Sequence, residues 1–324
     1  MTSPIIGRRA ALAGAILLPG LARGALPDRP LRILLGFAAG SGPDLLARLV
    51  ADALKEALPA GVVVDNRPGA GGLIAAQEVA RTAPADGSTL LLGEVGQLAM
   101  APSTYARLPY DPAKDFAAVA QLASADFAFV VPASVPADDL DGYIRWGKGQ
   151  AQLTMGTFGA GTPGHFGAAM LGAAAGLAVE PVHFRSTGDA VGAVLNGTVQ
   201  GMFGSVAVAA PHVKAGRLKA LAVTGPVRSP VLPDVPTMAE LGRPSLSFSA
   251  WFGLVAPAAT PAPVLEATEA AVLRALAAPA LIARLQEAGF RPSPAGRTAF
   301  AALMREETAR WAEVVRATGF KAIE

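Results

Sequence analysis

The chain has 324 residues, 52% hydrophobic and 16% charged, which is enough to bury the core of one large domain or of two ordinary ones. Its 27 lysines and arginines face 25 acids, and three of the arginines lie in the first 24 residues, so 24 basic residues remain against 25 acids. This balance excludes a nucleic-acid partner. The absence of cysteine excludes disulfides, thiolate metal ligands, cysteine nucleophiles and a lipidated cysteine anchor.

The first 24 residues have the pattern of a cleaved export signal. Arg8 and Arg9 precede a short apolar run, residues 10–22, which a small-residue exit follows at residues 22–24. The run is too short to span a bilayer, and no later segment reaches about 18 uninterrupted apolar residues. The paired arginines favour twin-arginine export, with an ordinary secretory signal as the alternative. We expect a soluble, unlipidated monomer in the periplasm.

The following segment alternates short apolar runs with amphipathic patterns. Asp44 is expected to be the N-cap of the first helix, because an acidic residue stands directly before the apolar periodicity. Each crossover is long enough to carry a helix, so parallel strand pairing is expected. The pattern predicts strands at residues 31–35, 62–64 and 89–92, and helices at residues 44–57 and 75–81.

A second α/β series follows, and the chain then ends in helices. A proline-rich loop is expected at residues 228–244, and an apolar stripe that includes Trp311 in the last helix is expected to pack in the core. Two successive series predict two lobes, with ligands at the carboxyl ends of the strands. Strands are predicted at residues 127–131, 153–157, 179–184, 199–203, 218–224 and 248–255, and helices at residues 137–148, 165–175 and 188–195.

Residues 159–164 have the spacing G-x-G-x-x-G between a predicted strand and a predicted helix. Glu180 follows about 20 residues later, as a dinucleotide-binding fingerprint requires. Thr162 and Pro163 stand where the backbone would have to approach a pyrophosphate, and the strand is not the first of the mature chain. Backbone N–H groups at a helix N-terminus favour any anion, so we prefer a general anion site that suits a carboxylate.

A second loop of this kind covers residues 37–44. Gly40, Ser41 and Gly42 can offer backbone N–H groups and a hydroxyl to an anion, while Asp44 is better explained as a helix cap than as a ligand contact. Two anion-binding loops on two lobes would hold a small acid between them.

The three histidines give no catalytic or metal-binding pattern. His165 stands beside the second glycine loop, where it either contacts a ligand or caps the turn, and structural roles are expected for His183 and His212. The spacings H-E-x-x-H and H-x-x-E-H are missing, as is a G-x-S-x-G nucleophile elbow. We therefore expect no metal site and find no spacing typical of a catalytic triad.

Three further side chains follow predicted strands and would face the same end of the sheet. Arg185 offers a bidentate fork to a ligand carboxylate, with a surface ion pair as the alternative. Glu94 and Gln97 lie in the loop after the strand at residues 89–92. A carboxylate at position 94 would repel an acid ligand unless it binds an amino group or stays out of contact.

Several motifs occur in a fixed order along essentially the whole mature chain: residues 64–72, 108–112 with 114–116, 211–218, 228–230 with 232–237, and 251–257. In this order they resemble the Bug family, the TctC-like periplasmic receptors of tripartite tricarboxylate transporters. The resemblance implies a two-lobed periplasmic binding protein fold of the α/β class, with a ligand cleft between two hinged domains. It divides the chain into domain 1, residues 25–124 and 246–324, and domain 2, residues 125–245, with hinges near residues 123–125 and 245–249.

The resemblance also implies a ligand site built from loops of both lobes. The loops 37–44 and 159–165 receive a carboxylate, and the turns near residues 93–97, 185–186 and 204–205 complete the cleft. The expected ligand-binding residues are Ala39, Gly40, Ser41, Gly42, Asp44, Glu94, Gln97, Gly161, Thr162, His165, Arg185, Ser186, Gly204 and Ser205.

This chain departs from the family pattern inside the expected pocket. Ala38 and Ala39 replace two prolines, Ser41 replaces a glycine, Gly204 stands where an acid is common, and Glu94 is unusual in its loop. These changes leave the ligand unidentified. We expect a receptor that captures a small organic acid for membrane permease subunits, with no cofactor and no enzymatic activity. The alternatives are an exported dinucleotide-dependent oxidoreductase and a receptor that reports to a sensor protein.

Overall fold

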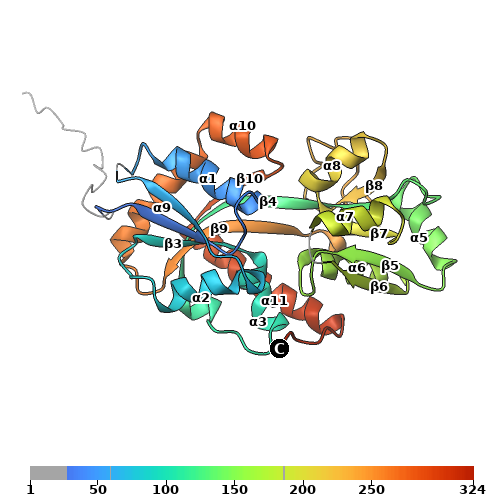
Figure 1. The fold of residues 1–324 in the computed structure, drawn as a ribbon, viewed down its shortest axis with the longest axis horizontal. Helices are drawn as coiled ribbons and strands as arrows, with labels where there is room; N and C mark the ends of the chain where they lie inside the picture. Colours follow the sequence, from blue (N-terminus) through green and yellow to red (C-terminus); the bar gives the residue numbers. More distant parts are fainter. Residues whose placement is uncertain (1–27, 59, 185–186) are drawn as a thin grey trace, which may run out of the picture.

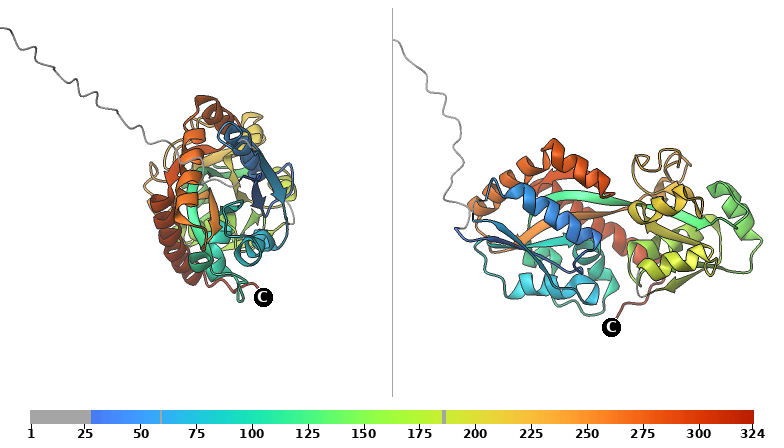
Figure 2. Two further views of the ribbon diagram at one scale, coloured as in Figure 1. Left: turned by 90° about the vertical axis from the view of Figure 1, so that its left-hand side faces the viewer. Right: turned by 45° about the horizontal axis from the view of Figure 1, so that its top comes forward.

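The computed structural model describes residues 28–58, 60–184 and 187–324. The predicted export signal lies outside the described residues. Figure 1 and the right-hand view of Figure 2 show two groups of helices and strands side by side, which we call lobe 1 and lobe 2. Two strands, β4 (Phe116–Pro132) and β9 (Ser249–Pro257), run between the two lobes.

Lobe 1 is built on parallel strands, as predicted. β1 (Leu31–Leu35) pairs in parallel with β2 (Val62–Asn66) on one side and with β3 (Thr89–Glu94) on the other. The helices of the lobe are α1 (Gly42–Leu54), α2 (Leu73–Arg81), α3 (Ala101–Thr104), α4 (Pro112–Asp115), α9 (Ala262–Leu276), α10 (Pro279–Glu287) and α11 (Arg297–Ala317), with the short 3-10 turn η1 (Ala70–Gly72) and the π-helical turn η2 (Gly96–Met100).

Lobe 2 repeats the strand–helix alternation. β5 (Leu153–Thr157) lies between the parallel strands β6 (Val179–His183) and β7 (Gly201–Ser205), and β8 (Leu218–Val223) pairs with β4. Its helices are α5 (Leu140–Lys148), α6 (Pro163–Ala175), α7 (Thr187–Leu195) and α8 (Val206–Lys214), and the 3-10 turn η3 (Pro244–Leu246) precedes β9. The proline-rich segment is loop, as expected, since residues 228–243 form no named helix or strand and η3 begins only at Pro244.

Strand β4 is much longer than the predicted strand at residues 127–131. Its first part, up to Asp126, pairs antiparallel with β9, and its second part, from Phe127, pairs with β7 and β8. The first part is rich in alanine and has a single β-branched residue, Val119, so its sequence carries little local strand signal. Pairing on both sides of the first part supplies the stability that its side chains do not.

The prediction that the chain ends only in helices is wrong, because β10 (Arg291–Gly296) pairs antiparallel with β4. This strand contains Pro292 and Pro294, and prolines are tolerated where a strand lies at the edge of a sheet.

The prediction that Trp311 packs in the core is confirmed. Its side chain is fully buried, with its ring 5.9 Å from that of Phe166 and 6.2 Å from that of Phe248. None of the described helices is both long and apolar enough to cross a membrane.

Candidate ligand-binding site

The first glycine loop leads into α1 through a serine cap. Ser41 is the N-cap, and its hydroxyl accepts a hydrogen bond from the backbone N–H of Asp44 at 3.4 Å. The prediction that Asp44 is the N-cap is therefore wrong: the cap lies three residues earlier, and the helix begins at Gly42. Gly40 has a φ of +79°, a conformation that glycine adopts without strain. Ala39, Gly40 and Gly42 are exposed, so the helix N-terminus is open to an anion.

The Asp44 carboxylate holds this loop from behind. Its side chain is 3% exposed and accepts hydrogen bonds from the N–H of Gly40 at 2.9 Å, from Nε of Arg48 at 3.0 Å and from Nδ2 of Asn66 at 2.9 Å. Desolvation raises the pKa of Asp44, but these hydrogen bonds outweigh it and lower the pKa below its usual value. Both carboxylate oxygens have partners within the protein, which gives Asp44 a loop-organising role.

Replacing Asp44 with alanine is expected to destabilise the protein by about 3 kcal/mol, because the N–H of Gly40 and the amide of Asn66 lose a charged acceptor. Urea denaturation of the ligand-free protein measures the loss. Asp52→Ala is the matched control, since its exposed carboxylate on the same helix pairs mainly with Lys55, and it should cost less than about 0.5 kcal/mol. Equal losses in the two variants would contradict the role of Asp44.

Gln97 lies beneath the first glycine loop. Its side chain is fully buried, and an ideal Cβ would lie 1.7 Å from Nε2 of Gln97 if added at Gly72 and 2.7 Å if added at Gly36. Neither polar atom of its amide has a hydrogen-bond partner in the described part of the chain. The backbone carbonyl of Gln97 accepts a hydrogen bond from the hydroxyl of Tyr110 at 2.9 Å. The structure thus places Gln97 against the predicted loop, behind its surface.

Glu94 ends β3 at the start of η2. Its partly buried carboxylate accepts hydrogen bonds from the backbone N–H groups of Gly96 and, at 3.2 Å, of Gln97. Desolvation raises the pKa of Glu94 to about 7, against the lowering effect of these two hydrogen bonds. Within the described residues no basic side chain forms an ion pair with it. Near neutral pH this carboxyl is therefore divided between its charged and protonated forms.

The second glycine loop is closed by Thr162 and His165. Thr162 is the N-cap of α6: its hydroxyl accepts from the N–H of His165 at 3.4 Å and donates to the carbonyl of Gly159 at 2.8 Å. The N–H of Gly161, which has a φ of +72°, donates to Nδ1 of His165 at 3.1 Å. His165 therefore caps its own loop, one of the two roles expected from the sequence.

His165 is neutral in this environment. Desolvation, with a further effect from the neighbouring His183, lowers the pKa of His165 to about 4. Because Nδ1 accepts a hydrogen bond, the proton of the neutral ring lies on Nε2. His183 has a structural contact of its own, a 2.6 Å hydrogen bond between its Nδ1 and the hydroxyl of Thr157. The second loop therefore presents the N-terminus of α6 to an anion, without a positive charge from His165.

The turn between α10 and β10, together with α8, connects the first loop to lobe 2. An ideal Cβ at Gly42 would lie 3.7 Å from the ring of Phe290, and one at Gly289 would lie 2.4 Å from Cβ of Ala207, near the start of α8. Since α8 begins directly after Gly204 and Ser205, the first loop and this turn approach the same place from opposite lobes.

The second loop meets the same turn within lobe 2. An ideal Cβ at Gly164 would lie 2.9 Å from the carbonyl oxygen of Phe203, the residue that precedes Gly204. Contacts thus link four of the expected segments: the loops 37–44 and 159–165, the turn 204–205 and, through Gly36, the side chain of Gln97. Arg185 and Ser186 lie outside the described residues.

The C-terminal segment also reaches the site, which the sequence did not predict. The ring of Phe320 lies 5.4 Å from that of His165. Ile323 is bound to lobe 1, because its N–H donates to the carbonyl of Thr104 at 2.8 Å and its carbonyl accepts from the N–H of Ala106 at 2.9 Å. Figure 1 places the C-terminus near α3 and α11, where the lobes meet. The segment follows the last helix without any motif that would have revealed this contact.

The described residues contain no group of three histidine, cysteine, aspartate or glutamate side chains that could hold a metal ion. The loops instead combine glycine-rich backbone, two hydroxyl caps and two helix N-termini. Such an arrangement is suited to binding an anion reversibly through neutral donors.

Known proteins share this architecture along almost their whole length. The solved structure of the periplasmic binding protein BugD has a TM-score of 0.78 and 29% identity, and covers 92% of this chain and 100% of its own. Rpa4515 of Rhodopseudomonas palustris, solved with adipate, has a TM-score of 0.82 and 29% identity over 92% and 99% of the two chains. MatC of the same organism, solved with bound malate, has a TM-score of 0.76 and 32% identity over 90% and 100%. The fold is therefore that of a periplasmic binding protein.

Sequence comparison gives the family. Residues 46–320 match the tripartite tricarboxylate transporter family receptor, and the chain belongs to this family. Protein BugT of Bordetella pertussis is 31% identical over 91% of both chains, and a UPF0065 protein in the tcbD-tcbE intergenic region of Pseudomonas sp. strain P51 is 34% identical over 96% of this chain and 94% of its own. The family is one of receptors and not of enzymes, so the oxidoreductase alternative is set aside.

Proposed function

We propose that this receptor binds a small organic acid between its two lobes in the periplasm and delivers it to the permease subunits of a tripartite tricarboxylate transporter. The observation that carries the proposal is the pair of serine- and threonine-capped helix N-termini, at α1 and α6, on loops linked by contacts across the lobes. The family and its structures with adipate and malate support a carboxylate as the ligand class.

The proposed ligand contacts are the exposed backbone at residues 39–42, the loop 161–165 and the turn 204–205, with Arg185 and Ser186 added from the family resemblance. Asp44 acts by holding the first loop, and Gln97 by supporting it from below. Glu94 is unusual in its loop by the family resemblance, while the common acid at position 204 is missing. This exchange moves an ionisable group from lobe 2 to lobe 1 and favours a ligand different from the usual short dicarboxylate.

We propose the domain division 25–124 with 246–324, and 125–245, with hinges near residues 123–125 and 245–249. The exchange of β4 partners supports it, because β4 leaves β9 at Asp126 and joins β7 at Phe127. A bidentate ion pair at this point, from Arg291 to Asp126 at 2.9 and 3.0 Å, supports a defined pivot. We further propose that residues 1–24 are a cleaved signal and that the exported receptor is a monomer.

A thermal-shift screen of residues 25–324 tests the function, with malate, adipate, citrate, benzoate, glutamate and NAD as probes. An acid in large excess over its dissociation constant should add roughly 2–4 kcal/mol to the free energy of unfolding. Stabilisation by NAD alone would reject the receptor proposal, as would the absence of a shift with every acid together with the failure of radiolabelled acids to be retained.

A pair of cap variants locates the ligand. Thr162→Ala should cost about 1 kcal/mol of stability through the lost cap of α6, and Asp139→Ala should cost about as much through the cap of α5, at the far end of lobe 2. Only Thr162→Ala should weaken acid binding, by about tenfold or more, in isothermal titration. Equal affinities in the two variants would place the ligand elsewhere.

A further inference from the structure

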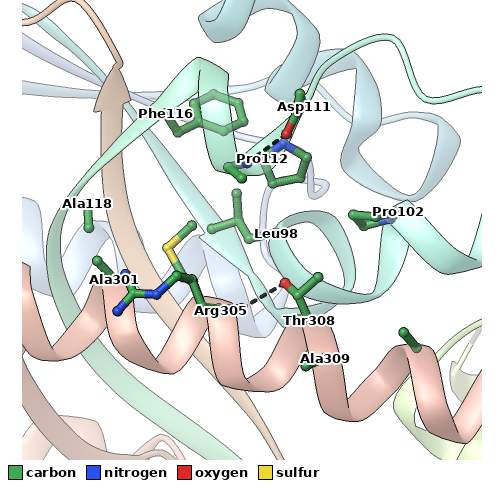
Figure 3. A pocket seen from close by; sticks show the side chains of 13 residues that line it. Leu98, Pro102, Asp111, Pro112, Phe116, Ala118, Ala301, Arg305, Thr308 and Ala309 are labelled. Carbon is green, nitrogen blue, oxygen red and sulfur yellow. Dashed lines mark hydrogen bonds between the residues drawn. The ribbon is translucent and has the colours of Figure 1, made fainter.

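A cavity of about 470 Å³ opens on lobe 1, between α11 and the segment from η2 to α4 (Figure 3). This volume lies within the range of roughly 300–1,000 Å³ that is usual for small-molecule sites. None of the residues proposed above to bind the acid lines it. Leu98, the residue that follows Gln97, is one of its lining residues. The cavity therefore lies behind the segment that supports the first loop.

The walls of the cavity are apolar. Leu98, Phe116 and Met304 are 1%, 7% and 8% exposed and form its inner surface, while Pro102 and Ala309 are exposed lining residues. An apolar chain or ring in this space would exchange contact with water for contact with buried side chains, which favours binding by about 25 cal/mol for each Å² of apolar surface covered.

Arg305 gives the cavity a charged end. In Figure 3 its guanidinium lies beside Ala301 and Ala118, with Pro102 at the opposite end. Arg305 forms no ion pair within the described part of the chain, whereas Asp111, the acid on the rim, is paired with Lys114 at 2.8 Å. The uncompensated charge at the cavity is therefore positive, and a carboxylate is the group that complements it best.

We propose that this cavity is a second binding site, which takes an amphipathic organic anion with its carboxylate on Arg305 and its alkyl chain or aromatic ring along Leu98 and Phe116. The site is separate from the acid site between the lobes and does not depend on the proposed transport function. Short, fully polar acids lack the apolar part that fills the cavity, so chain length separates the ligands of the two sites.

Octanoate is the probe, measured by isothermal titration on residues 25–324. Arg305→Gln should weaken octanoate binding about tenfold, and Ala309→Trp, which adds a large side chain at an exposed lining position, should weaken it further. Arg316→Gln, an exposed arginine on the same helix outside the cavity, is the matched control and should leave the affinity unchanged. Thr162→Ala should also leave it unchanged.

Two results would overturn the second site. One is the absence of measurable octanoate binding to the wild-type protein. The other is binding that Thr162→Ala removes while Arg305→Gln and Ala309→Trp keep it, which would place octanoate in the acid site. The transport proposal would survive the first result, because it depends on the acids of the thermal-shift screen.

Discussion

Replacing Gly36 with alanine is expected to destabilise the ligand-free protein by about 3 kcal/mol or more. An ideal Cβ at Gly36 would lie 2.2 Å from Cα of Gly72 and 2.8 Å from its carbonyl oxygen. Both atoms belong to the backbone, so no side-chain rotation relieves the overlap and the two loops must separate. Because Gly36 leads directly into the first glycine loop, acid binding should weaken as well. Urea denaturation and isothermal titration measure the two effects.

Gly192→Ala is the matched control for this variant. Gly192 lies inside α7, and an added Cβ would meet no atom within 4 Å. Alanine is the better helix former, so this change should stabilise the protein by roughly 0.5–1 kcal/mol. If Gly36→Ala were as stable as the wild type, the close approach of the two loops would not exist in solution.

Glu94→Gln is expected to stabilise the ligand-free protein at pH 8 and to change little at pH 4. Desolvation raises the pKa of Glu94 from the usual 4.5 to about 7, so the folded state holds this proton more tightly than the unfolded state. The associated stability is present below pH 4.5 and is lost as the pH rises through 7. The full loss is up to about 3 kcal/mol. Glutamine does not titrate and keeps a carbonyl acceptor for the N–H of Gln97.

Titration of His165 changes the stability of the folded protein in the opposite direction over an overlapping pH range. Its pKa is lowered from 6.5 to about 4, so its contribution to stability is lost as the pH falls from 6.5 through 4. The two effects partly cancel in the wild type, and the informative quantity is the difference between Glu94→Gln and wild type from pH 4 to 8. Glu56→Gln, an exposed acid of lobe 1, controls for the loss of a surface charge. A constant difference across this range would contradict the raised pKa.

Local patterns were sufficient for most elements of the fold. β1, β3 and β5 are short apolar runs bounded by loops, and their predicted positions agree with the structure to within two residues. The first part of β4 and all of β10 were not predicted, because alanine and proline give little strand signal on their own. β10 is a strand because it pairs with the first part of β4, and that part of β4 is a strand because it pairs with both β10 and β9.

In the candidate site, too, local patterns predicted some features and distant contacts decided the others. The glycine loops were predictable, since a strand, a glycine-rich turn and a capped helix follow one another within about ten residues. The N-cap was predicted one turn too late, at Asp44. The Asp44 side chain instead accepts a hydrogen bond from Asn66 at the end of β2, a contact that leaves no signal in the local sequence. The contact of Phe320 with His165 is equally non-local, since 155 residues separate them along the chain.

The sequence by itself determined that this chain is a two-lobed receptor of the tripartite tricarboxylate transporter family, because ordered motifs and the strand–helix alternation depend on neighbouring residues. Only the tertiary structure decided how the polar groups of the site behave. Burial raises the pKa of Glu94 and lowers that of His165, and hydrogen bonds from three segments lower that of Asp44. Desolvation and hydrogen bonding depend on groups that folding brings together from distant parts of the chain, and no local pattern records them.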